Sequence, residues 1–373
     1  MRRGSASLCG TFTHWIRSQL ESIWEYPVPM PRSYLQLGWL FALALAFVSL
    51  PSFARSGMSL SDVVEDAGRL GPLQTLMIAR NGEVLAEKSY RGHRTTQATN
   101  IKSASKSIIS ALVGIAIDRG VLSGTEEQVA TLLSADLPPR PDPRMNMLTV
   151  GHLLSMQAGL GSTSGQHYGS WVASRNWVRA ALARPFMDEP GGAMIYSTGS
   201  THLLSAILTK KTGRSTRQLA QEWLGSLERF SISNWTRDPQ GIYMGGNEMA
   251  MTTRSLLAFG ELYANGGLAP NGARVLSEAW IAQSWTPRTR SRYTGDGYGY
   301  GWFLTEMAGE AVRYGWGYGG QMIYVVPRLG LAVAMTSSSQ PSGGYLGHRE
   351  DLHRLMERII NAAQAEKIGA AST

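Results

Sequence analysis

Ser103 and Lys106 stand three residues apart in the segment Ser103-Ala104-Ser105-Lys106, at the start of a long apolar stretch. Residues at i and i+3 share one face of a helix, so the lysine amine can reach the serine hydroxyl. Burial lowers the pKa of a lysine, and a partly neutral amine can take the hydroxyl proton. N–H groups at a helix N-terminus also suit a developing oxyanion. The pair therefore indicates a serine nucleophile activated by lysine; the alternative is an N-capping serine beside a solvated lysine.

A second candidate group is Tyr196, in a segment that follows the turn 189–192 and precedes the apolar run 203–208. A phenol near a lysine ammonium can be held as phenolate and can serve as a general base. We therefore predict that Tyr196 joins Ser103 and Lys106. The alternative is a tyrosine that packs at a loop–helix junction.

A third candidate feature is the glycine-rich segment 315–321, Gly-Trp-Gly-Tyr-Gly-Gly-Gln, which leads into an apolar strand. Glycines at the head of a strand let the backbone of a substrate approach closely. A strand edge at this point can donate an N–H group to the other side of an oxyanion hole. The alternative is a loop that turns between two strands.

The polar stretch 161–168, GSTSGQHY, follows a predicted helix over 149–157. It can line a pocket into which Tyr168 points, or it can be a solvated loop. We retain Tyr168 as a candidate substrate-binding residue.

The elements that must position these groups follow from the pattern of apolar residues. Residues 73–90 read as two strands joined at Asn81-Gly82, a strong hairpin signal. Residues 103–120 read as a buried helix that ends at Gly120, and residues 125–250 read as mainly helical. The order of strands, helices, then strands predicts an α+β fold, an antiparallel sheet with helices packed on it and an inserted helical region. Later elements are expected at 254–265 (helix), 298–304, 321–326 and 331–336 (strands), and 349–364 (helix).

Composition excludes several classes of function. The 373 residues are 43% hydrophobic and 17% charged, which is typical of a globular domain. The net charge of +8 is scattered and forms no basic stripe, so we expect no nucleic-acid partner. No metal-ligand motif occurs, so we expect no metal and no cofactor. Lys211-Thr212-Gly213 spells a triad known from penicillin-recognising enzymes, but it ends a predicted helix, where Gly213 reads as an ordinary cap.

The first 54 residues read as an export signal. Arg32 precedes the apolar run 35–50, and Ser52-Phe53-Ala54 offers small residues for cleavage after Ala54. Met30 is a plausible true start, and residues 55–373 are then a single catalytic domain without cysteine, since Cys9 is the only one in the chain. We expect an exported protein, periplasmic or secreted. Alternatives are a membrane anchor over residues 34–53, although the apolar run is short for a span of about 20 residues, and a buried core helix.

With these elements in order, residues 72–362 resemble the serine β-lactamase-related family, which includes class C β-lactamases, D-alanyl-D-alanine peptidases, family VIII esterases and 6-aminohexanoate-dimer hydrolases. The stretches that carry the resemblance are SASKSIISALVGIAIDRG, HLLSMQAGL, EPGGAMIYSTGSTHLLSAIL, WTRDPQGIYMGGNEMAMT and GYGGQMIYVVP. The resemblance implies a two-part β-lactamase/transpeptidase-like fold, with the site in the cleft between a sheet layer and an all-helical part.

The resemblance also implies roles for single residues. Ser103 is similar to the family's acylated nucleophile and Lys106 to its proton partner, and Tyr196 resembles the tyrosine of the Y-x-N motif. The implied oxyanion hole uses the N–H groups of Ser103 and Gln321. Residues 318–320, Tyr318, Gly319 and Gly320, stand where class C enzymes have K-T-G and are expected to contact substrate.

Two departures from the family pattern bear on the substrate. Thr198, also expected in the substrate site, replaces the asparagine of Y-x-N, and Tyr318 replaces the lysine of K-T-G. That lysine supplies a positive charge for carboxylates, and charge-assisted hydrogen bonds are about twice as strong as neutral ones. We therefore expect an acyl-enzyme hydrolase of a small ester or amide, an esterase or amidase. The alternatives are a peptidoglycan D,D-peptidase or β-lactamase, and a non-catalytic binding module on the same fold.

Overall fold

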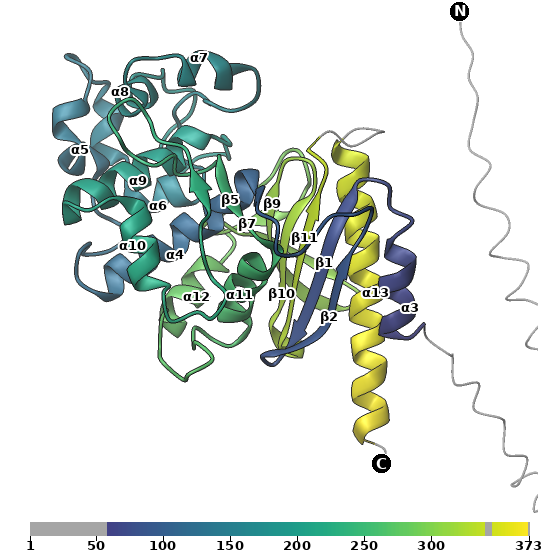
Figure 1. Cartoon of the computed structure of the whole chain (residues 1–373). Coiled ribbons are helices and arrows are strands. Elements are labelled where there is room, and N and C mark those ends of the chain that lie inside the picture. Colours follow the sequence, from purple (N-terminus) through teal and green to yellow (C-terminus); the bar gives the residue numbers. More distant parts are fainter. Residues whose placement is uncertain (1–57, 340–344, 372–373) are drawn as a thin grey trace, which may run out of the picture. The chain divides into compact units, whose positions relative to one another are not determined.

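A computed structural model of the chain describes residues 58–339 and 345–371, all within one compact unit, Gly57–Thr373 (Figure 1). The predicted export signal, residues 1–54, lies outside the described residues. At the centre is an eight-stranded antiparallel sheet, as the α+β prediction requires. In their order across the sheet, the strands are β2 (Glu83–Ser89), β1 (Leu73–Arg80), β11 (Leu331–Ser337), β10 (Gln321–Val326), β9 (Glu310–Gly317), β8 (Phe303–Met307), β7 (Gly297–Tyr298) and β6 (Thr289–Arg290).

The predicted hairpin at residues 73–90 is confirmed. Asn81 and Gly82 both have positive φ, 50° and 84°, which is the conformation of the tight turns that suit the twist of a two-stranded ribbon. β1 pairs with β2 on one side and with β11 on the other. The sheet therefore places the first strands of the described chain beside its last strand.

Successive side chains of each strand point to opposite faces of the sheet, and both faces carry apolar side chains. Leu76 and Ile78 of β1 point to one face, and Met77 and Ala79 point to the other. The first face packs against α3 (Leu60–Ala67) and α13 (Tyr345–Ala371), which lie side by side in Figure 1. The second face packs against α11 (Thr253–Ala264), close to its predicted bounds. The two layers of helix leave both faces of the central strands covered.

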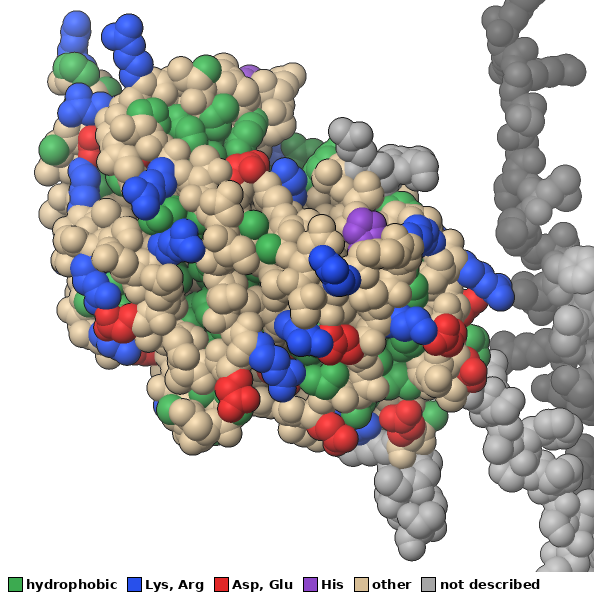
Figure 2. All heavy atoms as spheres, in the orientation of Figure 1, with side chains coloured by type: hydrophobic (Ala, Val, Ile, Leu, Met, Phe, Trp, Pro, Cys, Tyr) green, Lys and Arg blue, Asp and Glu red, His purple; other side chains and the backbone are tan. Residues whose placement is uncertain are grey.

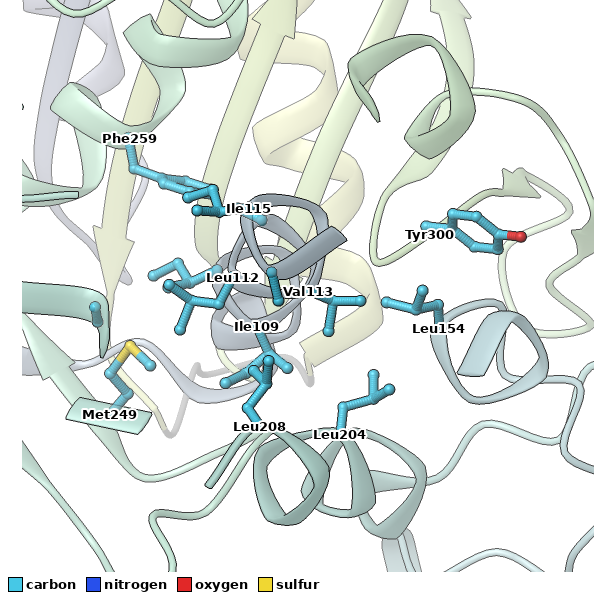
Figure 3. Close-up of a cluster of buried hydrophobic side chains, with 14 of the residues drawn as sticks. Ile109, Leu112, Val113, Ile115, Leu154, Leu204, Leu208, Met249, Phe259 and Tyr300 are labelled. Carbon is cyan, nitrogen blue, oxygen red and sulfur yellow. The ribbon is translucent and has the colours of Figure 1, made fainter. Parts of the chain in front are cut away.

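Helix α4 (Ser105–Asp118) links the sheet to the helical region. Nearly all of its residues are buried, which is the mark of a helix that packs on every side. In Figure 3 its side chains Ile109, Leu112, Val113 and Ile115 meet residues from several other elements: Leu154, Leu204, Leu208, Met249, Phe259 and Tyr300. The helix that follows the candidate nucleophile is therefore anchored to both parts of the fold.

The region between residues 125 and 250 is less regular than predicted. It consists of helices broken by long turns, and its two strands form a three-stranded sheet, in the order β3-β5-β4, with β3 (Thr99–Asn100) from earlier in the chain. We did not predict this sheet, because its strands are too short to show a period-2 pattern. The elements of the region are α5 (Val129–Leu132), α6 (Val150–Leu154), α7 (Tyr168–Val172), α8 (Trp177–Leu182), α9 (Thr198–Thr212), α10 (Thr216–Trp223), β4 (Asn234–Trp235) and β5 (Met249–Met251), and α12 (Glu278–Ser284) comes later.

Three predictions near the site are wrong in detail. The strand expected at 298–304 is two strands, β7 and β8, because Gly301 has a φ of 78° and turns the chain between them. Residues 315–317 belong to β9 and not to a loop. The helix expected from residue 103 is preceded by a 3-10 turn, Lys102–Ala104. In each case a glycine or a serine-rich stretch hides the boundary.

The surface shown in Figure 2 mixes Lys and Arg with Asp and Glu, and hydrophobic side chains are dispersed over it. Within the described part of the chain, no helix combines the length and apolar character that a membrane span requires.

Gly114 in α4 provides a test of this packing. A Cβ at position 114 would lie 2.4 Å from ring atoms of Trp280 in α12, so we expect Gly114→Ala to lower the free energy of unfolding by about 1–3 kcal/mol despite the better helix propensity of alanine. Gly169→Ala in α7 is the matched control, since a Cβ there meets nothing within 4 Å; it should be neutral or stabilising. Denaturant unfolding measures both, and equal effects would contradict the close α4–α12 contact.

Candidate active site

Ser103 lies in the 3-10 turn Lys102–Ala104, directly before α4, and is only partly buried. It lines a cavity of about 890 Å³. The turn is fixed on one side by the Ile101 N–H, which donates to the Met249 carbonyl at 2.8 Å. On the other side, the Ser105 hydroxyl donates to the Lys102 carbonyl at 2.8 Å. The hydroxyl expected to be the nucleophile is therefore held at a cavity wall by the start of a buried helix.

Lys106 lies within reach of Ser103, as the i, i+3 spacing predicts. Its Nζ is 3.2 Å from Ser103 Oγ and donates to the Gly246 carbonyl at 2.7 Å. The side chain is buried, and burial lowers the pKa of Lys106 to about 7. A large fraction of the amine is therefore neutral near pH 7. Such an amine can accept the proton of a serine that becomes a nucleophile.

Tyr196 completes the cluster. The Lys106 Nζ lies 4.9 Å from the centre of its ring, and its phenol interacts with the Ser103 side chain. Burial raises the pKa of Tyr196 to about 12, although the contact with Ser103 opposes this. The structure therefore favours a neutral phenol beside a neutral amine over the phenolate that the sequence predicts. Of the two groups, Lys106 is the better base, and Tyr196 is placed to pass a proton.

The polar segment 161–168 holds Tyr196 in place. Its Ser162 hydroxyl donates to the Tyr196 carbonyl at 2.7 Å, and Ser164 Oγ accepts the Thr198 N–H at 2.8 Å. The hydroxyls of Ser164 and Thr198 also lie 3.0 Å apart. This stretch is thus neither a solvated loop nor only a pocket wall, because its short hydroxyl side chains bind the backbone of the tyrosine segment.

The turn between β9 and β10 brings the third element to the nucleophile. A Cβ at Gly317 would lie 2.1 Å from the Ile101 carbonyl, so only glycine lets β9 come this close to the turn that carries Ser103. Gln321, the first residue of β10, pairs with Gly317, and β10 contacts the Lys102–Ala104 turn. The Gln321 side chain bonds both backbone groups of Ser337. The paired N–H groups of Ser103 and Gln321 remain a predicted oxyanion hole.

The remaining predicted substrate residues separate into two groups. Tyr168, Thr198 and Tyr318 line the cavity. Gly319 and Gly320 do not line it; their φ angles are 85° and 99°. A Cβ at Gly319 would meet the backbone at Ser338, and a Cβ at Gly320 would meet the ring of His348. Their role is to turn the chain tightly below Tyr318.

Several cavity residues escaped the sequence analysis. Phe303 falls in a predicted strand and Trp316 in the glycine-rich segment 315–321, but neither side chain was singled out, and Tyr293 lies in a loop without a motif. Asn247 and Glu248 follow Gly245-Gly246 in a stretch for which the sequence offered no role. The described residues that line the cavity are Lys102, Ser103, Ser162, Ser164, Gly165, Gln166, His167, Tyr168, Tyr196, Thr198, Asn247, Glu248, Ser291, Tyr293, Phe303, Trp316 and Tyr318.

The Lys-Thr-Gly triplet and a buried histidine do not line this cavity. Lys211-Thr212-Gly213 closes α9, where Gly213 takes the left-handed conformation of a helix cap, as predicted. His202 is fully buried, with its Nε2 3.1 Å from an Asp238 carboxylate oxygen. Among the residues that the structure describes, no group of three His, Cys, Asp or Glu side chains is placed to bind a metal.

A sheet layer is joined to a helical region, Ser103 and Tyr196 line one cavity, and Lys106 is buried beside Ser103. This is the arrangement that an active-site serine hydrolase working through an acyl-enzyme requires. A model of the β-lactamase family, described as "Beta-lactamase", matches residues 61–356. The chain therefore belongs to the β-lactamase family and is a serine hydrolase of that family.

Relatives and solved structures agree with this membership. The chain is 24% identical to the 6-aminohexanoate-dimer hydrolase of Paenarthrobacter ureafaciens over 287 residues. This alignment covers 70% of this chain and 71% of the relative. A penicillin-binding protein homologue from Caulobacter crescentus superposes with a TM-score of 0.63 at 18% identity, over 81% of this chain and 96% of the other. A family VIII carboxylesterase does so with a TM-score of 0.63 at 17% identity, over 81% and 96%. These two structures show the shared fold.

The lowered pKa of Lys106 predicts the pH dependence of the reaction. Below pH 7 the amine is protonated and cannot take the Ser103 proton, so kcat/KM for p-nitrophenyl butyrate should rise with pH through an apparent pKa near 7. Lys106→Met keeps the volume but has no base, and should lower kcat/KM by about 10²- to 10⁴-fold. Lys210→Met, at an exposed position in α9, is the control. The same rising limb in Lys106→Met would show that another group titrates.

Proposed function

We propose that Ser103 is the nucleophile of a two-step acyl transfer. The Ser103 hydroxyl oxygen attacks the carbonyl carbon of an ester or amide, and its proton passes to the Lys106 amine. The negative charge on the carbonyl oxygen is stabilised by the N–H groups of Ser103 and Gln321. The observation that carries this proposal is the 3.2 Å contact between Ser103 Oγ and the Lys106 Nζ, whose pKa is lowered to about 7.

The first half ends when the bond from the carbonyl carbon to the leaving oxygen or nitrogen breaks and the Lys106 ammonium returns the proton to that atom, with the Tyr196 phenol as a relay beside Lys106 and Ser103. The second half uses the same groups. A water molecule then attacks the acyl-enzyme, gives its proton to Lys106, and releases the acid while Ser103 regains its proton. One base serves both steps, so no further carboxylate is required for deacylation.

The walls of the cavity favour a small acyl substrate that is neutral or bears an amine. Among the described residues that line the cavity, Lys102 and Glu248 carry the charged side chains of the Lys, Arg, Asp and Glu types. The Lys102 Nζ lies 3.7 Å from Glu248 Oε1. Phe303, Trp316 and Tyr318 supply aromatic surface. Since Tyr318 stands where the family resemblance places a carboxylate-binding lysine, we propose small esters and simple amides as substrates. The relative from Paenarthrobacter, named as a 6-aminohexanoate-dimer hydrolase, supports the 6-aminohexanoate dimer as a substrate to test.

A substrate panel tests this function. Wild type and Ser103→Ala are assayed against p-nitrophenyl butyrate, 6-aminohexanoate dimer and nitrocefin, and both are treated with a fluorophosphonate probe. We expect turnover of the ester or the dimer and a covalent mass increase on Ser103, both lost in Ser103→Ala.

Three outcomes would contradict the proposal. Wild-type rates in Ser103→Ala would reject the nucleophile. Nitrocefin turnover much faster than that of the ester would favour a β-lactamase or D,D-peptidase. A failure of the probe to label the wild-type chain would indicate a binding module.

We further propose that the protein is exported. The apolar run 35–50 and the small residues before Arg55 support a cleaved signal. The charge of the mature chain would be about +6, because residues 1–54 carry four Arg and two Glu and so remove +2 from +8.

N-terminal sequencing of protein recovered from the periplasm or medium tests this second proposal. We expect a chain that begins at Arg55. A membrane fraction that retains Met1 or Met30 would instead support the anchor over residues 34–53.

A further inference from the structure

Two residues beside the nucleophile have an unusual backbone conformation. Lys102, directly before Ser103, has a φ of 52°, and Glu248, two residues after Gly246, has a φ of 54°. Residues with side chains seldom adopt this left-handed conformation, and it persists where the surroundings over-determine it, often at functional sites. The side chains of both residues line the cavity.

Asn100 connects these two residues. Its amide nitrogen donates to Glu248 Oε2 at 2.7 Å, and its amide oxygen accepts the backbone N–H of Lys102 at 2.9 Å. The Lys102 Nζ lies 3.7 Å from Glu248 Oε1, which closes a ring of contacts. The backbone beneath this ring is the small sheet, in which Asn100 of β3 pairs with Ala250 of β5.

The segment 246–248 therefore contacts both lysines that flank Ser103. The Gly246 carbonyl accepts from Lys106, and the Glu248 carboxylate faces Lys102. We propose that Glu248 and Asn100 are positioning residues that hold Lys102 in its left-handed conformation, and thereby fix the direction of the Ser103 hydroxyl and N–H. The role depends on the proposed function, in which Ser103 is the nucleophile.

The contacts of Glu248 favour this role over direct binding of substrate. Its carboxylate is already engaged by the Asn100 amide and by the Lys102 amine. The Lys102 and Glu248 side chains are 25% and 30% exposed, and partly exposed ion pairs contribute little to stability. We therefore expect the loss of Glu248 to affect the rate of acylation more than the unfolding of the protein.

Glycine at position 102 separates the two explanations, because glycine adopts a positive φ without steric cost. Glu248→Ala should slow the labelling of Ser103 by a fluorophosphonate by about 10- to 100-fold in the natural chain, as expected when a reacting group is misplaced. In a Lys102→Gly background, compared with that parent, Glu248→Ala should slow labelling by less than about threefold, since the pair is then non-additive. KM for p-nitrophenyl butyrate should change little, and kcat should fall.

Three further variants complete the experiment. Asn100→Ala should reproduce the rate loss of Glu248→Ala, and Glu248→Gln, whose amide oxygen can still accept from Asn100, should retain an intermediate rate. Glu222→Ala removes a carboxylate that pairs with Arg119 and Arg214 far from the cavity, and should leave labelling unchanged. The thermal unfolding midpoint is measured for every variant.

The positioning role is overturned by any of three results: no rate loss in Glu248→Ala, an equal loss in both backgrounds with a raised KM, or a loss that disappears after correction for the folded fraction. The second of these would assign Glu248 to substrate contact. Mass spectrometry locates the label, and a label on another serine would overturn the proposed function as well.

Discussion

The contact between the buried Lys106 amine and the Ser103 hydroxyl is the interaction on which the rest of the site depends. Burial penalises the ammonium form, so the amine is available as a base near neutral pH, and the Gly246 carbonyl keeps it aimed at the hydroxyl. A solvated lysine in the same place would stay protonated and could not take a proton. The chemistry therefore follows from the depth of α4 in the fold.

That depth is produced by segments distant in the sequence. The sheet closes one side of α4 through β9, the helical region closes the other through α9, and the segment 246–248 covers the amine itself. Close approach depends on small residues, since a side chain at Gly317 would collide with Ile101 and one at Gly246 would come within 3.0 Å of the Lys106 Nζ. The glycines near the site thus serve proximity as much as turning.

Much of this arrangement could be predicted from sequence. The hairpin at Asn81-Gly82, the buried helix after Ser103 and the order of strands and helices are local patterns, and they led to the α+β fold. The three reactive side chains could be proposed because each carries distinctive chemistry. What was missed depends on distant contacts: the two-residue strands of the small sheet, the hydroxyls of Ser162 and Ser164 that bind the tyrosine segment, and the cavity face of Trp316. The raised pKa of Tyr196 was also missed, because burial cannot be read from a motif.

The position of Tyr318 has a consequence for how such enzymes diversify. Its side chain is 51% exposed at the cavity, while the turn beneath it is shaped by glycines on either side. These glycines set the tight turn that precedes Gln321. With Tyr318 as part of the proposed substrate surface, a mutation at this one position would change what a substrate meets while the glycines that shape the turn stay in place. A lineage could then explore new substrates by single steps.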